Sequence, residues 1–309
     1  MTRYAFRLVN VFAESPLAGN PLCVFEDARG LDTPTMQALA LQFNLSETTF
    51  VLPSTSATAQ VRIFTPAFEM PFAGHPTLGT AHVVRALLRA GDPTAAEGVL
   101  RRAGDDATGR RATSADLDRV TLEMKAGVIP VAADGDVWTL DANAPRHHGV
   151  AANRAELAAM LGLDEADVAP DPAAPPLWVD TGSQQLVIPL ASAAAVARAA
   201  PRADLLQRHG SNETRAMAYV FAPSGPGAMD ARFFFPKHGS VIEDPGTGSA
   251  CANLGGWLLA TGATLPQRLS IAQGDAVGRP CRLGLEVSAD RRIRVSGRVV
   301  ELGRGTVSL

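Results

Sequence analysis

Short runs of β-branched and aromatic residues, set among polar positions and turn residues, recur along the chain and are typical of half-buried strands. They predict strands at Tyr4–Phe12, Thr48–Leu52, Gln60–Phe64, Val120–Met124, Gln185–Pro189, Met217–Phe221, Ala231–Phe235 and Arg292–Ser296. Helical spacing of apolar residues is rarer and predicts helices at Pro34–Phe43, Thr77–Arg89, Arg154–Leu163, Ala203–Arg208 and Ser249–Ala260. Polar stretches predict surface loops at Gly104–Asp118 and Asp164–Pro176. These elements predict a strand-rich α+β fold without regular alternation of strand and helix.

A motif of the form E-x-P-x-x-G occurs twice, at Glu69–Gly74 and again at Glu243–Gly248. Each copy follows an expected strand that ends in an aromatic-x-proline segment, Phe64–Pro66 or Phe234–Pro236, and each runs into an apolar helix. Because strand, turn and helix follow in the same order, we interpret the chain as two similar halves. The offset between the copies places the seam at Ala126–Val131.

The start of each of these two helices is a candidate anion site, because unpaired backbone amides and the positive end of the helix dipole favour a carboxylate. Two halves related by a pseudo-two-fold axis would turn both helix starts toward one interdomain cleft, where ligands commonly bind. A plainer interpretation stays open, in which Gly74 and the segment Gly246–Gly248 only permit tight turns.

The polar side chains around these turns have two interpretations each. Glu47 is either a general base in a partly desolvated cleft or a solvated loop residue. His75 either titrates near neutral pH as an acid or base, or only forms hydrogen bonds within the turn. Asp244 has the alternative role of a turn former, and Ser249 that of an N-cap. The segment around Ser249 lacks the G-x-S-x-G pattern of a serine hydrolase.

The composition is that of a globular chain with balanced charge. Its 309 residues are 46% hydrophobic, and the net charge of −3 excludes the broad basic surface that nucleic-acid binding needs. The three cysteines, Cys23, Cys251 and Cys281, are far apart and form no zinc-binding pattern, so we expect buried thiols in a reducing compartment. No apolar stretch is long enough to span a bilayer, so we expect a cytoplasmic protein with no membrane partner.

Taken together, the motifs resemble the PhzF family of phenazine-biosynthesis proteins. The matching segments are Gly19–Pro21, Asn44–Thr48, Phe64–Pro66, Gly74–Gly79, Glu243–Ala250, Gln273–Gly274 and Gly278–Pro280. They occur in the family's order over nearly the whole chain, which makes the resemblance specific for the family, though not for one substrate.

The resemblance implies a diaminopimelate epimerase-like fold with two pseudo-symmetric domains, each a β-roll or barrel around a central helix. The N-terminal domain would comprise residues 1–128 together with about 297–309, and the C-terminal domain residues 129–296. The active site would lie in the cleft between them. The family is usually homodimeric and uses no cofactor, so we expect a homodimer without a cofactor or a bound metal.

The resemblance also implies a function, that of an isomerase similar to trans-2,3-dihydro-3-hydroxyanthranilate isomerase. Such an enzyme shifts a proton by acid–base catalysis on a small cyclic amino or hydroxy carboxylate, its only expected partner besides a second copy of the chain. Carried over to the matching positions, the catalytic residues are Glu47, His75 and Asp244. The substrate-binding residues are Asn20, Ser46, Gly74, Gly246, Thr247, Gly248 and Ser249.

Two alternatives remain, an epimerase or racemase of a small carboxylic acid and a non-catalytic relative that binds a metabolite. Epimerases and racemases that resemble this fold use two cysteines, one before each glycine-containing turn. Those positions are Ala73 and Pro245 in this chain, which disfavours a two-thiol mechanism.

Overall fold

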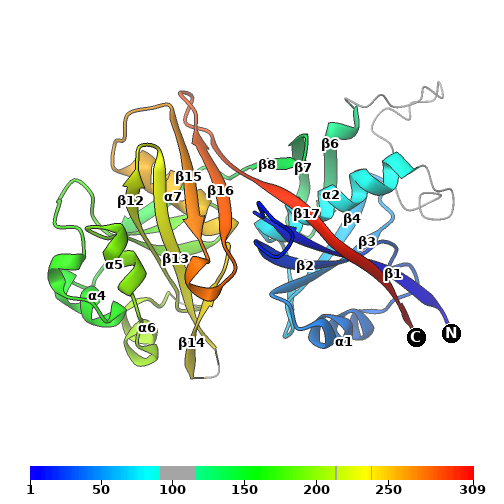
Figure 1. The fold of residues 1–309 in the computed structure, drawn as a ribbon, viewed down its shortest axis with the longest axis horizontal. Coiled ribbons are helices and arrows are strands. Elements are labelled where there is room, and N and C mark those ends of the chain that lie inside the picture. Colours follow the sequence, from blue (N-terminus) through cyan, green and yellow to red (C-terminus); the bar gives the residue numbers. More distant parts are fainter. Residues whose placement is uncertain (91–115, 213, 238) are drawn as a thin grey trace. The chain divides into compact units, whose positions relative to one another are not determined.

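The computed structural model describes residues 1–90, 116–212, 214–237 and 239–309. Two compact units make up the chain (Figure 1). Unit 1 comprises Met1–Leu140 and Ser296–Leu309, and unit 2 comprises Asp141–Val295. Most of the polar loop expected at Gly104–Asp118 lies outside the described residues.

The strands of unit 1 are β1 (Arg3–Val11), β2 (Asn20–Phe25), β3 (Glu47–Leu52), β4 (Ala59–Phe64), β5 (Glu69–Met70), β6 (Arg119–Met124), β7 (Gly127–Asp134) and β8 (Val137–Asp141). Its helices are α1 (Thr33–Phe43), α2 (Gly74–Ala90) and the short 3₁₀ helix η1 (Asp116–Asp118). The long strand β17 (Ile293–Ser308) begins in unit 2 and continues into unit 1.

The strands that begin and end within unit 2 are β9 (Arg146–Gly149), β10 (Leu177–Asp180), β11 (Gln184–Pro189), β12 (Ala218–Gly225), β13 (Ala228–Lys237), β14 (Ser240–Asp244), β15 (Gln267–Gln273) and β16 (Cys281–Val287). Its helices are α4 (Arg154–Leu161), α5 (Ala193–Arg198), α6 (Ala203–His209) and α7 (Gly248–Ala260), with the short 3₁₀ helices η2 (Glu165–Asp167) and η3 (Asp275–Val277). Helix α5 was not expected, because its alanine-rich sequence lacks apolar periodicity.

The strands of unit 1 close into a ring around a buried helix. Strands β1, β2, β3, β4, β6, β7, β8 and β17 each pair with the next, and β17 pairs with β1. Helix α2 contacts β1, β2, β3, β6 and β7 and is buried along most of its length. Gly79 makes this packing possible, because a Cβ there would lie 2.6 Å from Leu22 Cδ2. Helix α1 packs on the outer face of the sheet through Met36, Leu39 and Ala40.

Unit 2 repeats the strand pairing of unit 1. Strands β10 to β16, with α7 between β14 and β15, form the same succession of antiparallel and parallel pairs as β1 to β7, with α2 between β5 and β6. Helix α7 is buried and contacts β9, β10, β11 and β16, whereas α4, α5 and α6 cover the opposite face of the sheet (Figure 1). The duplicated motif therefore marks a duplicated topology.

The glutamate of the first E-x-P-x-x-G motif has a structural partner. Glu69 on β5 pairs with Arg62 on β4 at 2.8 Å, and the guanidinium of Arg62 lies 5.0 Å from the centre of the Phe64 ring. Lys125 also binds Glu69, at 2.6 Å.

The second copy repeats this cluster. Glu243 on β14 pairs with Arg232 on β13 at 2.6 Å, and the Arg232 guanidinium lies 4.7 Å from the centre of the Phe234 ring. Arg232 also donates to the backbone carbonyls of Val196, Ala197 and Ala199 at the end of α5. Both motif glutamates thus hold the strand before the turn, and neither lies among the expected catalytic residues.

The boundary between the units falls after Leu140, later than the expected position after residue 128. The reason is that β7 and β8 extend the antiparallel meander begun by β6 and complete the ring of unit 1. The chain returns to unit 1 at Ser296.

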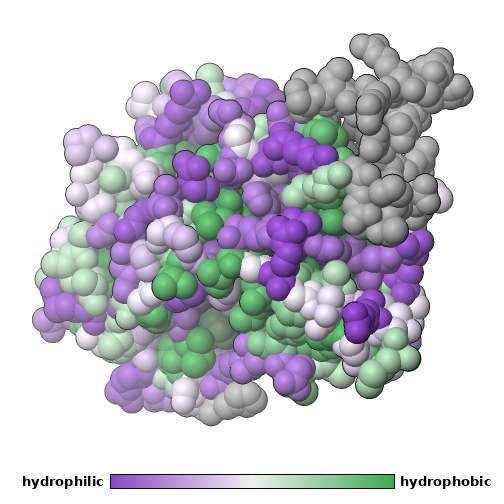
Figure 2. All heavy atoms as spheres, turned by 45° about the vertical axis from the view of Figure 1, so that its right-hand side comes forward, coloured by the Kyte–Doolittle hydropathy of each residue, from purple (hydrophilic) through white to green (hydrophobic). Residues whose placement is uncertain are grey.

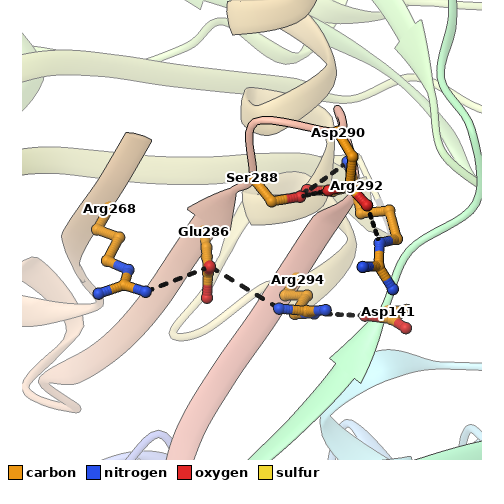
Figure 3. Close-up of polar contacts among 7 residues, drawn as sticks. All are labelled: Asp141, Arg268, Glu286, Ser288, Asp290, Arg292 and Arg294. Carbon is orange, nitrogen blue, oxygen red and sulfur yellow. Dashed lines mark hydrogen bonds and ion pairs between the residues drawn. The ribbon is translucent and has the colours of Figure 1, made fainter. Parts of the chain in front are cut away.

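Four residues of unit 2 form a row of alternating charges, on β15, on β16, on the first part of β17 and at the last residue of β8 (Figure 3). Arg268 lies 3.6 Å from Glu286, Glu286 lies 3.8 Å from Arg294, and Arg294 lies 2.9 Å from Asp141. Beside this row, Asp290 binds Arg292 in the turn between β16 and β17. The row links the first residue of unit 2 to the strand by which the chain leaves it.

The surface of the described residues mixes hydrophilic and hydrophobic side chains on the face that Figure 2 shows. Among the described residues, no helix has the length and apolar character that crossing a membrane requires.

Candidate active site

Glu47 and His75 meet in unit 1. Glu47 is the first residue of β3, and its pairing with Leu22 on the parallel strand β2 fixes its place in the sheet. His75 is the second residue of α2. The Glu47 Oε2 atom lies 3.5 Å from His75 Nε2, and the two side chains are 15% and 7% exposed. The structure therefore favours the partly desolvated carboxylate over the solvated loop residue.

Burial decides the charge of His75 in the free protein. Desolvation lowers the pKa of its imidazole to about 3, and a hydrogen bond to the Pro21 backbone opposes this shift only in part. His75 Nε2 makes no hydrogen bond of normal length, so the nitrogen that bonds Pro21 is Nδ1. The ring is therefore neutral at physiological pH, with its proton on Nδ1 and the lone pair of Nε2 directed toward Glu47.

This shift predicts a pH dependence of stability. Below about pH 6.5 the unfolded chain takes up a proton on residue 75 that the folded chain does not accept until about pH 3, so stability falls across that window. Between pH 7 and pH 5 His75 is expected to account for about 2 kcal/mol of the loss in unfolding free energy. Urea denaturation of the wild type and His75→Gln at both pH values measures it. An equal loss in both proteins would contradict the assignment.

The other expected residues of unit 1 lie around this pair. Asn20 is the first residue of β2 and its side chain is fully buried, next to the Pro21 backbone that bonds His75. Gly74 begins α2. Ser46 lies just before β3 and is exposed.

Asp244, Thr247 and Gln273 form a hydrogen-bonded group in unit 2. The hydroxyl of Thr247 donates to Asp244 Oδ2. The amide of Gln273 accepts from the Thr247 backbone at 3.3 Å and donates to the Asp244 backbone carbonyl at 2.9 Å and to Thr247 Oγ1 at 3.0 Å. Thr247 Oγ1 thus accepts from Gln273 and uses its hydrogen to donate to the Asp244 carboxyl group.

Glycines shape the turn between β14 and α7. Thr247 is the N-cap of α7, Gly248 is the first residue of the helix, and Gly246 is buried in the turn. Gly274 has φ = +82° and lies so close to the Pro245 carbonyl that a Cβ would collide with it. The glycines of this turn can therefore permit its tight backbone and also belong to a site for an anionic ligand at the start of α7.

Ser249 is the second residue of α7, so it is not the N-cap that the sequence offered as an alternative. Its Oγ accepts a hydrogen bond of 2.9 Å from Gln185 Nε2. Gln185 Oε1 in turn accepts from Asn253 Nδ2 at 2.8 Å. Gln185 and Asn253 were not among the expected site residues, because isolated amides carry no local sequence pattern.

None of the three cysteines is available as a thiolate. Cys23, Cys251 and Cys281 are all free and buried, as expected. Burial raises the pKa of each thiol far above its usual value, so none is a thiolate at neutral pH. Within the described part of the chain, no three His, Cys, Asp or Glu side chains cluster as metal ligands would.

Comparisons with known proteins place these features in a family. A family model described as phenazine biosynthesis-like protein (PhzC-PhzF) matches residues 9–104 and 106–305. The uncharacterized isomerase PM1503 of Pasteurella multocida is 38% identical over 307 residues, covering 99% of this chain and 94% of the relative. Trans-2,3-dihydro-3-hydroxyanthranilate isomerase of Pseudomonas chlororaphis is 33% identical over 314 residues, covering 98% of each chain.

The fold of the chain is also similar to that of solved structures. The crystal structure of a Bacillus anthracis phenazine biosynthesis protein of the PhzF family superimposes with a TM-score of 0.82 at 24% identity, with all of both chains covered. Solved structures of this kind confirm the expected fold.

Proposed function

Because this chain belongs to the phenazine biosynthesis-like (PhzC-PhzF) family and is an isomerase, we propose that it moves a proton by acid–base catalysis. The proposed substrate is a small cyclic amino or hydroxy carboxylate similar to trans-2,3-dihydro-3-hydroxyanthranilate. The observation that carries the proposal is the partly buried carboxyl of Glu47 beside a neutral His75.

In the proposed reaction the carboxylate of Glu47 removes a proton from one carbon of the substrate, and the adjacent π electrons shift along the ring. The resulting carboxylic acid returns the proton to a second carbon on the same face, so proton and charge balance within one turnover. His75 Nε2 can accept a hydrogen bond from the acid form of Glu47, which holds the proton between the two transfers.

The residues of unit 2 serve substrate binding in this proposal. Asp244 binds the amino group. Ser249 and the amides at the start of α7 bind the carboxylate, because the helix N-terminus carries partial positive charge. Fixed dipoles at this position also stabilise electron density that develops during the proton shift.

Turnover of trans-2,3-dihydro-3-hydroxyanthranilate in D₂O tests the proposal. Because the Glu47 side chain is 15% exposed, the proton that it carries can exchange with solvent before it is returned. We therefore expect isomerised product with deuterium at the carbon protonated last, measured by NMR. Product without deuterium would contradict exchange at Glu47, and binding without product or exchange would favour the metabolite-binding alternative.

A separate measurement tests the alternative of a thiol-based epimerase or racemase. Because Cys251 is fully buried and its thiol is not ionised, Cys251→Ala is expected to keep kcat within about threefold of the wild type. Treatment of the native enzyme with iodoacetamide should likewise leave the rate unchanged. Loss of activity in either experiment would support a mechanism that uses a cysteine thiol.

A further inference from the structure

A chain of buried amides leads from the segment between β10 and β11 to Ser249. The Thr181 backbone N–H and hydroxyl both donate to Asn253 Oδ1, at 2.9 and 2.7 Å. Asn253 Nδ2 donates to the Ser183 carbonyl at 2.8 Å and to Gln185 Oε1 at 2.8 Å. Asn253 is 0% exposed and Gln185 3% exposed, so water does not compete for these bonds.

The direction of this chain is set by backbone groups that have only one hydrogen-bonding role. The Thr181 N–H can only donate, so the Asn253 atom that faces it is the oxygen. The Ser183 carbonyl can only accept, so the Asn253 atom that faces it is the nitrogen. The orientation of the Asn253 amide therefore follows from the backbone and does not depend on an arbitrary choice between oxygen and nitrogen.

The fixed amide of Asn253 then orients Gln185, and Gln185 orients Ser249. Because Asn253 donates to Gln185 Oε1, the nitrogen of Gln185 faces Ser249 and donates to its Oγ at 2.9 Å. The hydroxyl hydrogen of Ser249 then points away from Gln185, and within the described residues no protein group accepts it. Gln185 therefore occupies one lone pair of Ser249 Oγ and leaves the hydroxyl hydrogen available to a ligand.

We propose that Gln185 and Asn253 are positioning residues that fix the Ser249 hydroxyl as a donor and thereby make its site selective for a carboxylate over a carboxamide. This inference rests on the proposed function, in which Ser249 binds the substrate carboxylate. An anion needs donors only, and a serine without the bond from Gln185 could turn both of its lone pairs toward the ligand.

The equivalent positions of unit 1 show that the chain of amides is not a requirement of the fold. Helices α2 and α7 begin at Gly74 and Gly248, so Gly79 is the counterpart of Asn253. With the two motif copies aligned, strand register makes Leu22 the counterpart of Gln185, and a Cβ on Gly79 would meet this apolar side chain. The duplicated topology therefore forms without amides here, which indicates that those of unit 2 serve its site.

The test compares two ligands that differ only in the group that Ser249 would bind, anthranilate and anthranilamide, by isothermal titration calorimetry. In Gln185→Glu the new carboxylate accepts from Asn253 and from the Ser249 hydroxyl, so the hydroxyl turns inward. We expect the Kd of anthranilate to rise at least about tenfold, while that of anthranilamide stays within about threefold. Gln184→Glu, which places the same charge at the neighbouring position of β11, should leave both affinities unchanged.

A double-mutant cycle with Ser249→Ala separates the effect transmitted by the Ser249 hydroxyl from direct charge repulsion by the introduced carboxylate. If the hydroxyl transmits the effect, Gln185→Glu weakens anthranilate binding by less than about threefold in the Ser249→Ala background. Additive losses, or equal losses for both ligands, would overturn the inference. If Gln185→Glu does not fold, Gln185→Met in the same cycle tests the same coupling. A wild type that binds both ligands equally would also overturn the inference, whereas a wild type that binds neither would instead contradict the proposed substrate class.

Discussion

Glu47→Gln is expected to lower kcat by about 10³-fold and to abolish deuterium incorporation from D₂O. The amide keeps the size of the side chain and its place at the start of β3, but it cannot take a proton from carbon. Because Glu47 is the carboxyl group that faces His75, no other acid or base at this position is expected to replace it. Rates under substrate saturation and NMR of the recovered substrate measure the two effects.

Two further variants show whether the loss is specific. Glu123→Gln, on β6 of the same unit, keeps hydrogen-bonding capacity toward Ser54 and Ser56 and should retain full activity. Glu47→Asp keeps a carboxylate but withdraws it from the substrate, so we expect a smaller loss than in Glu47→Gln. Deuterium incorporation by Glu47→Gln at the wild-type rate would disprove the role of Glu47 as the base.

Arg232→Met is expected to destabilise unit 2 by about 3–5 kcal/mol, because it leaves a buried carboxylate without its partner. The Glu243 side chain is only 6% exposed, and its Oε2 atom receives two bonds from Arg232. The variant also removes the donor to three carbonyls at the end of α5. Urea denaturation gives the free energy, and hydrogen exchange of β13 and β14 shows whether the loss arises there.

The repeat supplies the matched control. Arg62→Met removes the corresponding arginine of unit 1, but Glu69 keeps its bond to Lys125, so we expect a loss of only about 1–2 kcal/mol. Replacing Glu243 with Gln in the Arg232→Met background should recover part of the stability by removing the buried charge. Equal losses for Arg62→Met and Arg232→Met would contradict this account.

The duplicated architecture was predictable from the sequence because its markers are local. The E-x-P-x-x-G copies lie in turns whose backbone depends on a few adjacent residues. Apolar periodicity located all five expected helices within three residues of their observed starts and ends. The expected helix at Thr77–Arg89 began too late, since Gly74 and His75 belong to α2 although they look like turn residues.

The amides that surround the candidate site could not be predicted in this way. Gln185 and Asn253 become neighbours only when β11 packs against α7, and nothing near either residue signals that contact. The neutral state of His75 could not be predicted from the sequence either, because the desolvation of its side chain depends on the packing of α2 inside the ring of unit 1. Sequence alone therefore located candidate residues but could not assign their protonation or hydrogen-bond direction.

The pairing of β1 with β17 has a consequence for synthesis on the ribosome. Unit 2 is one uninterrupted stretch, whereas unit 1 takes strand pairs such as Arg3 with Ser308 from distant parts of the chain. The first unit to emerge is therefore the last to be completed, and β1 and β8 present open edges throughout translation of unit 2. A released chain that ends at Val295 should therefore contain a folded unit 2 and an unfinished unit 1.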